Sequence, residues 1–263
     1  MTITADTLRD AAHRARFPLD ETRPTVFVVR NCTAEGRFQL DTGTNNCDTV
    51  WLFDHTGISR PLRCRSLPHQ KYQAQMVAGT ARANYIASGY YRHAWMRGPH
   101  RGHPALVQHQ RFLIWRSADM ELHRDDPDPT DDWNDYGIVA DNMHGWAPFS
   151  AGCVTVVGNM APPTEDWAIV HRWAYTTHRR ASHFAAIILD HPDISTARTA
   201  VRYGSQGDEV RHVQHMVSTA TGIDIGEIDG NFGYRTHDAV RVYQRSINER
   251  DTGILEIYRE GER

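Results

Sequence analysis

His144 and Cys153 are the residues whose types and spacing allow nucleophilic chemistry. A cysteine is strongly nucleophilic only as its thiolate, and a neighbouring imidazole can accept the thiol proton and hold the charged pair near neutral pH. Eight residues separate the two, and they include Gly145, Pro148 and Gly152. These residue types favour a turn that brings His144 and Cys153 together between two strands.

The residues around this pair have predicted supporting roles. Gly152 permits tight backbone geometry, and the main-chain N–H groups of Gly152 and Cys153 are expected to stabilise an oxyanion. Either Asp141 or a backbone carbonyl is expected to orient the second nitrogen of His144. Trp146 and Ser150 are candidate substrate-binding residues within the same loop. This chemistry needs no diffusible cofactor and no metal.

The pattern His-Gly followed by Ser-x-Gly-Cys, over residues 144–153, resembles the signature of the L,D-transpeptidase catalytic domain and of related phage wall enzymes. The resemblance implies that Cys153 attacks a carbonyl of the peptidoglycan stem peptide, and that an amine or water resolves the acyl-enzyme. The His–Cys interval is shorter than in that family, Ala151 replaces a common second histidine, and Thr155 replaces a common arginine. These differences favour hydrolysis relative to transfer.

Two other interpretations of these residues stay open. A cysteine before the strand-like run Val154–Val157 is often only a small buried hydrophobe, and a single histidine is often a structural hydrogen bonder. A metal centre is the competing enzymatic interpretation, with histidines at 93, 100, 103 and 109 and carboxylates at 125, 126, 128, 131 and 132. No His-Glu-x-x-His motif is present, so the acidic run is predicted to be a solvated loop or weak cation site.

A mainly β domain is predicted to position the catalytic pair. β-Branched and aromatic runs, separated by Gly, Pro, Asn and Asp, indicate strands closed as a sandwich or barrel. The expected strands cover 25–30, 50–53, 75–77, 85–87, 105–108, 112–115, 154–157 and 184–189, and 167–175 is either a helix or an edge element. The predicted domains are a polar leader or short helix (1–22), a catalytic domain (23–194), a linker (195–201) and a C-terminal domain (202–263).

The C-terminal segment has the pattern of a small helical domain. Val210, Val213 and Val217 predict a helix over 209–218, and a Gly-rich loop at 229–233 precedes a second helix that Thr236 is expected to cap. Residues 254, 255 and 257 are expected to supply the third element that closes the core, in a domain of three helices. The ordered motifs, Asp-Gly-x-Phe-Gly among them, resemble the peptidoglycan-binding domain of bacterial cell-wall hydrolases and phage lysins. The resemblance makes Asp229 and Phe232 candidate wall-binding residues.

The length of the chain is sufficient for two domains, and its charge argues against two classes of partner. The 263 residues suffice for two domains, and a net charge of −3 without a long basic run argues against nucleic-acid or membrane-surface binding. The start of the chain lacks the pattern of a secretory signal, which favours synthesis in the cytoplasm and action at the wall after lysis or another route. Cys32, Cys47 and Cys64 are expected to be reduced, although one disulfide among them is an alternative.

The sequence therefore predicts a peptidoglycan-binding cell-wall enzyme that acts on stem peptides through a Cys/His pair. One alternative is a phage or prophage endolysin that hydrolyses stem peptides with the same residues. Another is a non-catalytic wall-binding or virion protein in which the His and Cys pattern is structural. The oligomeric state and the bond acted on are not specified by the sequence.

Overall fold

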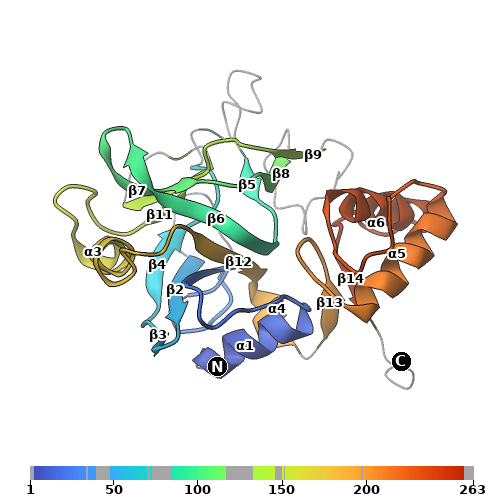
Figure 1. The fold of residues 1–263 in the computed structure, drawn as a ribbon, viewed down its shortest axis with the longest axis horizontal. Helices are drawn as coiled ribbons and strands as arrows, with labels where there is room; N and C mark the ends of the chain where they lie inside the picture. Colours follow the sequence, from blue (N-terminus) through green and yellow to red (C-terminus); the bar gives the residue numbers. More distant parts are fainter. Residues whose placement is uncertain are drawn as a thin grey trace.

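The protein is described by a computed structural model in which a β-rich N-terminal region is followed by a smaller helical unit (Figure 1). The structure describes residues 3–33, 35–39, 48–69, 72, 84–116, 133–145, 150, 152–196 and 198–257. The predicted combination of a mainly β domain and a small helical C-terminal domain is confirmed.

A closed barrel forms the N-terminal region. In the described residues one sheet has the order β1-β12-β6-β7-β10-β11-β4-β2-β3, and an additional β1–β2 pairing closes it, which leaves β3 attached outside the ring. Most neighbours are antiparallel, whereas β1–β12 and β10–β11 are parallel. The strands are β1 (Thr25–Arg30), β2 (Asp48–Asp54), β3 (Gly57–Ile58), β4 (Leu62–Arg65), β6 (Gly89–His100), β7 (His103–Gln108), β10 (Met143–Gly145), β11 (Val154–Val156) and β12 (Phe184–Asp190).

The expected strands at 25–30, 50–53, 85–87, 105–108, 112–115, 154–157 and 184–189 are confirmed within a residue or two at their ends. The expected strand at 75–77 lies outside the described residues. A smaller sheet contains β5 (Tyr85–Ile86), β8 (Phe112–Arg116) and β9 (Trp133–Gly137). The segment 167–175 is helical, in α3 (Glu165–Arg172) and the π-helical turn Trp173–Thr177.

Both faces of β1 and β12 are apolar and buried, one in the main core and the other in a second core. Val26 and Val28 belong to the main core, whereas Phe27 and Val29 belong to a second core. That second core includes Leu8 of α1 (Ala5–Arg14), a helix that begins with a capping box at Thr4. Of the two alternatives for residues 1–22, the short helix is the one formed, and α1 buries its apolar stripe against the barrel.

The C-terminal unit has two helices and a two-stranded sheet. α5 (Asp208–Thr221) and α6 (Tyr234–Ser246) enclose a core that includes Val210, Phe232 and Val240. β13 (Thr199–Val201) pairs with β14 (Leu255–Ile257), so the closing element is a strand and the expected third helix is not formed. The N-cap of α6 is Gly233, while Thr236 lies buried inside the helix. The short helix α4 (His191–Ser195) and β13 occupy much of the expected linker.

A close junction connects the C-terminal unit to the barrel. Gly89 and Gly204 lie where backbones meet: a Cβ on Gly89 would lie 2.6 Å from the carbonyl oxygen of Tyr203, and one on Gly204 would lie 2.5 Å from that of Tyr90. Gly204 also has φ +89°, a conformation that favours glycine. The Tyr90 N–H donates to Tyr203 O at 3.0 Å. The two units thus contact each other through their main chains.

Side chains extend this junction. The Arg202 guanidinium is 3% exposed and donates two hydrogen bonds to the Asp193 carboxylate, at 2.6 and 2.7 Å. Tyr136 of β9 stacks on Tyr234 of α6, with ring centroids 5.2 Å apart.

No helix in the described ranges is both long and apolar enough to cross a membrane.

Candidate active site

Two adjacent parallel strands position the predicted catalytic pair. β10 carries His144, and Cys153 comes immediately before β11, whose Thr155 is the register partner of His144. The Val154 N–H donates to Asn142 O at 2.9 Å, which ties the start of β11 to the start of β10. His144 and Cys153 therefore lie close together at adjacent parallel strands, whereas most of the predicted turn, at residues 146–149 and 151, lies outside the described residues.

Strand alternation places the pair on the outer face of the barrel wall. Met143, Val154 and Val156 are buried in the main core. Because successive side chains along a strand point to opposite faces, His144 and Thr155 face away from that core. His144 is nevertheless only 2% exposed, and Cys153 is half-buried. The site is a covered polar cluster on the barrel surface.

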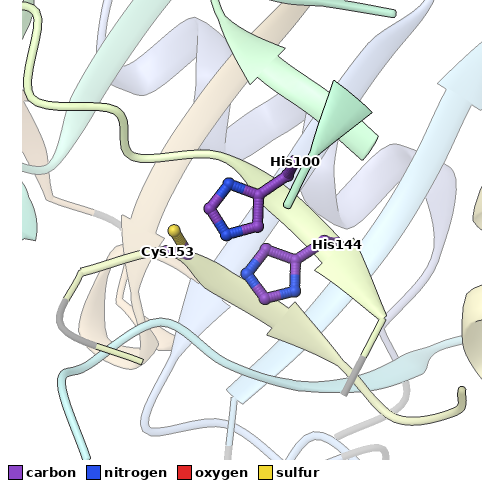
Figure 2. A group of neighbouring side chains, drawn as sticks. All are labelled: His100, His144 and Cys153. Carbon is purple, nitrogen blue, oxygen red and sulfur yellow. The ribbon is translucent and has the colours of Figure 1, made fainter. Parts of the chain in front are cut away.

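A third side chain joins the pair. Nitrogen atoms of His100 and His144 and the Cys153 sulfur all lie within 4.8 Å of one another. Figure 2 shows a nitrogen of each imidazole turned toward the sulfur. The two rings are stacked, with centroids 4.7 Å apart and an interplanar angle of 13°. The catalytic role of the pair was predicted without His100, which had been considered only as part of a histidine cluster.

The Nδ1 atom of His144 lies 2.6 Å from the carbonyl oxygen of Gly145. A carbonyl can only accept, so Nδ1 carries the hydrogen and Nε2 has the lone pair that faces the sulfur. Of the two predicted orienting groups, the structure uses the backbone carbonyl. Asp141 instead accepts a hydrogen bond from Asn84. This tautomer of His144 is the one that a general base for Cys153 requires.

Burial makes both members of the pair neutral in the resting protein. Burial raises the pKa of the Cys153 thiol to about 11, and the negative charge of Asp141 acts in the same direction. Burial also lowers the pKa of His144 to about 4. The expected thiolate–imidazolium pair is therefore not the resting state. Proton transfer from Cys153 to His144 must accompany attack on a substrate.

The loop residues mainly fix the position of Cys153. The Ser150 hydroxyl donates to the carbonyl oxygen of Cys153 at 3.0 Å and accepts from the Gly152 N–H at 3.3 Å. Ser150 is 5% exposed and its hydroxyl is bonded within the loop, while its predicted role in substrate binding stays a prediction. The Gly152 N–H, predicted as an oxyanion donor, is engaged by Ser150. Trp146 and Ala151 lie outside the described residues.

Thr155 occupies the position at which the resembled family commonly has arginine. Its hydroxyl is buried and has no hydrogen-bond partner among the described residues. The register partner of Thr155 on β4 is Arg65, which is 2% exposed. An arginine is therefore adjacent in the sheet, on a strand that the His-Gly and Ser-x-Gly-Cys pattern does not include.

The two candidate wall-binding residues differ in their surroundings. Asp229 is exposed, and its carboxylate accepts hydrogen bonds from Gln214 Nε2 at 3.0 Å and from the Asn231 N–H at 2.8 Å. Phe232 is 2% exposed within the core of the C-terminal unit. Burial of this ring stabilises the fold, and a contact of Phe232 with the wall stays a prediction.

The competing metal interpretation is only partly reproduced. The predicted histidine cluster is divided. His100 joins Cys153, whereas the ring centroid of His183 lies 4.0 Å from that of His109 and 5.1 Å from that of His93. The carboxylates at 125, 126, 128, 131 and 132 lie outside the described residues. Among described residues, the group able to hold a metal ion is His100, His144 and Cys153.

A cavity of about 480 Å³ lies away from Cys153, between the barrel and the C-terminal unit. Arg30, Ser88 and Asp193 line its barrel side, and His237 and Glu256 line the other. No disulfide joins Cys32, Cys64 and Cys153 to one another, and Cys47 lies outside the described residues.

Comparison with known proteins identifies the C-terminal unit. Residues 206–256 match the family model described as "Putative peptidoglycan binding domain". The match begins just before α5 and ends within β14. No curated protein and no solved structure matches the chain. A peptidoglycan-binding domain indicates peptidoglycan as a partner and the cell wall as the site of action.

Proposed function

We propose that this chain, which carries a peptidoglycan-binding domain at its C-terminus, is a cell-wall enzyme that acts on stem peptides through Cys153 and His144. The observation that carries the proposal is the Cys153 sulfur facing the lone pair of His144 Nε2, in the same chain as the wall-binding domain. The resemblance of residues 144–153 to the L,D-transpeptidase signature supplies the reaction class. Acyl transfer or hydrolysis then follows from the choice of acceptor.

The reaction begins with a neutral thiol and a neutral imidazole. His144 Nε2 takes the thiol proton as the Cys153 sulfur attacks the peptide carbonyl carbon, and a C–S bond forms while the carbonyl oxygen gains the negative charge. The C–N bond then breaks, and the leaving amine takes the proton from His144. In the second half, His144 removes a proton from an incoming amine or water, which attacks the thioester carbonyl carbon. The C–S bond then breaks, and His144 returns the proton to the Cys153 sulfur. An amine acceptor gives a cross-link, and water gives cleavage.

One observation favours a second candidate function, a non-catalytic wall-binding protein. Burial raises the pKa of the Cys153 thiol to about 11, so the thiol is protonated at neutral pH. Buried structural cysteines are commonly inert for this reason. In this alternative the His/Cys cluster only stabilises the β10–β11 connection, and a partner protein supplies the chemistry.

Mass spectrometry of muropeptides tests the proposal. Purified peptidoglycan is incubated with the wild-type protein, with Cys153→Ala and with Cys32→Ala, a matched variant at a buried cysteine of the second core. We expect new cross-linked or trimmed stem peptides from the wild type and from Cys32→Ala but not from Cys153→Ala. Cross-linked products identify transfer, and trimmed products identify an endolysin-type hydrolase. Unchanged muropeptides with sacculus binding retained would leave the non-catalytic alternative.

A further inference from the structure

His100 lies at the end of β6, on a strand remote in sequence from the Cys153 loop. The hairpin that joins β6 to β7 pairs His100 with His103, and β7 in turn pairs with β10 through Leu106 and Met143. This strand order places His100 beside His144, and their rings stack. The two imidazoles therefore approach one sulfur from two different strands (Figure 2).

A short chain of hydrogen bonds fixes the tautomer of His100. The backbone N–H of Gln108 donates to Asn142 Oδ1 at 2.8 Å, which determines the orientation of that amide. Asn142 Nδ2 then lies 2.9 Å from His100 Nδ1. Because an amide nitrogen can only donate, His100 Nδ1 is the acceptor. The hydrogen of the neutral ring is consequently on Nε2, the nitrogen that is left to face the sulfur.

The two histidines thus present opposite groups to Cys153. His144 carries its hydrogen on Nδ1 and offers a lone pair at Nε2, whereas His100 offers an N–H at Nε2. We infer that His100 is a further catalytic residue, a neutral hydrogen-bond donor to the Cys153 sulfur and to the oxygen of the reacting carbonyl. This inference rests on the proposed thiol chemistry and adds to it the group that receives the developing negative charge.

The inferred role matches the needs of each step. As His144 removes the thiol proton, the His100 N–H donates to the sulfur, and when the C–S bond forms it donates to the oxyanion. His100 keeps its own proton throughout, so atoms and charges balance as in the two-step reaction above. Burial lowers the pKa of His100, with a further contribution from the charge of Arg101, which keeps the ring neutral. Because Ser150 engages the Gly152 N–H, His100 would replace one of the two predicted oxyanion donors.

The same three side chains also have the donor set of a Cys-His₂ zinc site. Binding a metal through His100 Nε2 would require a lone pair there, and the ring hydrogen would have to move to Nδ1, where Asn142 already donates. The hydrogen-bond chain from Gln108 therefore favours the donor role over metal ligation.

The first test is the tautomer itself. In protein labelled with ¹⁵N-histidine, long-range ¹H–¹⁵N correlation spectra distinguish the protonated from the unprotonated ring nitrogen, and spectra of His100→Gln and His144→Gln assign the signals. We expect the hydrogen on Nε2 in His100 and on Nδ1 in His144. A hydrogen on His100 Nδ1, or one zinc ion per chain that His100→Phe loses, would overturn the inference.

The second test is the reactivity of the thiol, measured without a wall substrate. The rate of Cys153 alkylation by iodoacetamide is followed against pH by mass spectrometry for wild type, His100→Phe and His100→Gln. Phe keeps the stacked ring but has no donor, whereas the Gln amide restores an N–H near the Nε2 position. We expect alkylation to slow about tenfold in His100→Phe and to recover in His100→Gln, because a donor stabilises the thiolate. His103→Phe, at the paired position on β7, is the matched control and should alkylate like wild type.

Turnover of peptidoglycan by the same variants separates the two proposals. If the wild type leaves muropeptides unchanged, the proposed function fails, while the tautomer and alkylation tests still decide the role of His100. If the wild type is active and His100→Phe matches it in both turnover and alkylation, the inference about His100 fails and the function stands. Near-ultraviolet circular dichroism confirms that each variant is folded.

Discussion

The Asn84 amide donates a hydrogen bond to the Asp141 carboxylate directly beside Gly152. A Cβ at position 152 would lie 2.4 Å from Asp141 Oδ1 and 2.7 Å from Asn84 Nδ2. Both side chains are buried, so neither can move aside freely. The pair therefore restricts position 152 to glycine and sets how closely the Cys153 loop approaches the barrel.

Gly152→Ala is expected to displace the Cys153 loop. Overpacking of this kind costs about 1–3 kcal/mol of stability, and the displaced sulfur loses its alignment with His144. Urea unfolding and muropeptide turnover measure the two effects. Gly137→Ala is the matched control, because a Cβ there meets nothing within 4 Å. Equal stability and turnover in the two variants would contradict this account of Gly152.

His144 is expected to make stability depend on pH. Its pKa is near 6.5 in the unfolded chain and about 4 in the folded protein, so the unfolded state binds more protons between these values. Stability conferred by the neutral ring is therefore complete above about pH 6.5 and falls as pH decreases, by about 3 kcal/mol near pH 4. Urea unfolding of wild type and His144→Gln between pH about 7 and about 4.5 measures this slope.

The decline should be shallower in His144→Gln, because that position no longer titrates. His100 adds to the wild-type slope, since burial lowers its pKa as well. Parallel curves for the two proteins would show that His144 is not buried in its neutral form.

Gln214 is expected to determine the shape of the Gly-rich loop in the wall-binding domain. Its Nε2 donates to Asp229 Oδ1 at 3.0 Å and Asn231 O at 3.1 Å, and its Oε1 accepts from the Gly230 N–H at 2.9 Å. Gln214→Ala removes these buried bonds and should destabilise the C-terminal unit by about 3 kcal/mol. Thermal unfolding and pelleting with purified sacculi measure stability and binding. Gln206→Ala, at an exposed position, should change both very little.

The Arg202–Asp193 ion pair is expected to hold the two units together. Asp193→Asn leaves the buried Arg202 guanidinium without its countercharge, which costs about 3–5 kcal/mol when a buried pair is broken. The exposed Arg198–Glu256 pair is the comparison, because Arg198→Gln should cost less than about 1 kcal/mol. Limited proteolysis between the units and urea unfolding report the difference. Similar losses in both variants would mean that burial of Arg202 has no energetic consequence.

Local patterns predicted the His144–Cys153 pair because the two residues are only nine positions apart and lie on neighbouring strands or next to them. His100 was not placed in the site, because its position depends on the order β6-β7-β10, which no local pattern encodes. The strand that carries it also contains Gly98 and Pro99, residue types that commonly end strands. Polar residues that converge only through strand order require the tertiary structure.

The expected third helix of the C-terminal unit failed for a similar reason. Residues 255–257 form a strand because β13, far earlier in the chain, offers them a partner. The sequence left a short helix and a polar leader as alternatives for α1, because alanines contribute much of its buried stripe and alanine gives a weak hydrophobic signal. In contrast, α5 was predicted well, since its buried valines follow the helical period without competition from other elements.

The glycine-lined junction determines how far from its anchoring point on the wall the protein can act. A wall-binding domain on a flexible tether lets its catalytic partner search a sphere whose radius is the tether length. Here Gly89 and Gly204 bring main chain against main chain, so the span between the anchoring surface and the Cys153 sulfur is set by packing. In an enzyme of the proposed kind, this fixed distance determines which bond of the wall can reach Cys153. Once the C-terminal unit holds the wall, the bond that reacts is the one at the correct distance from the anchor.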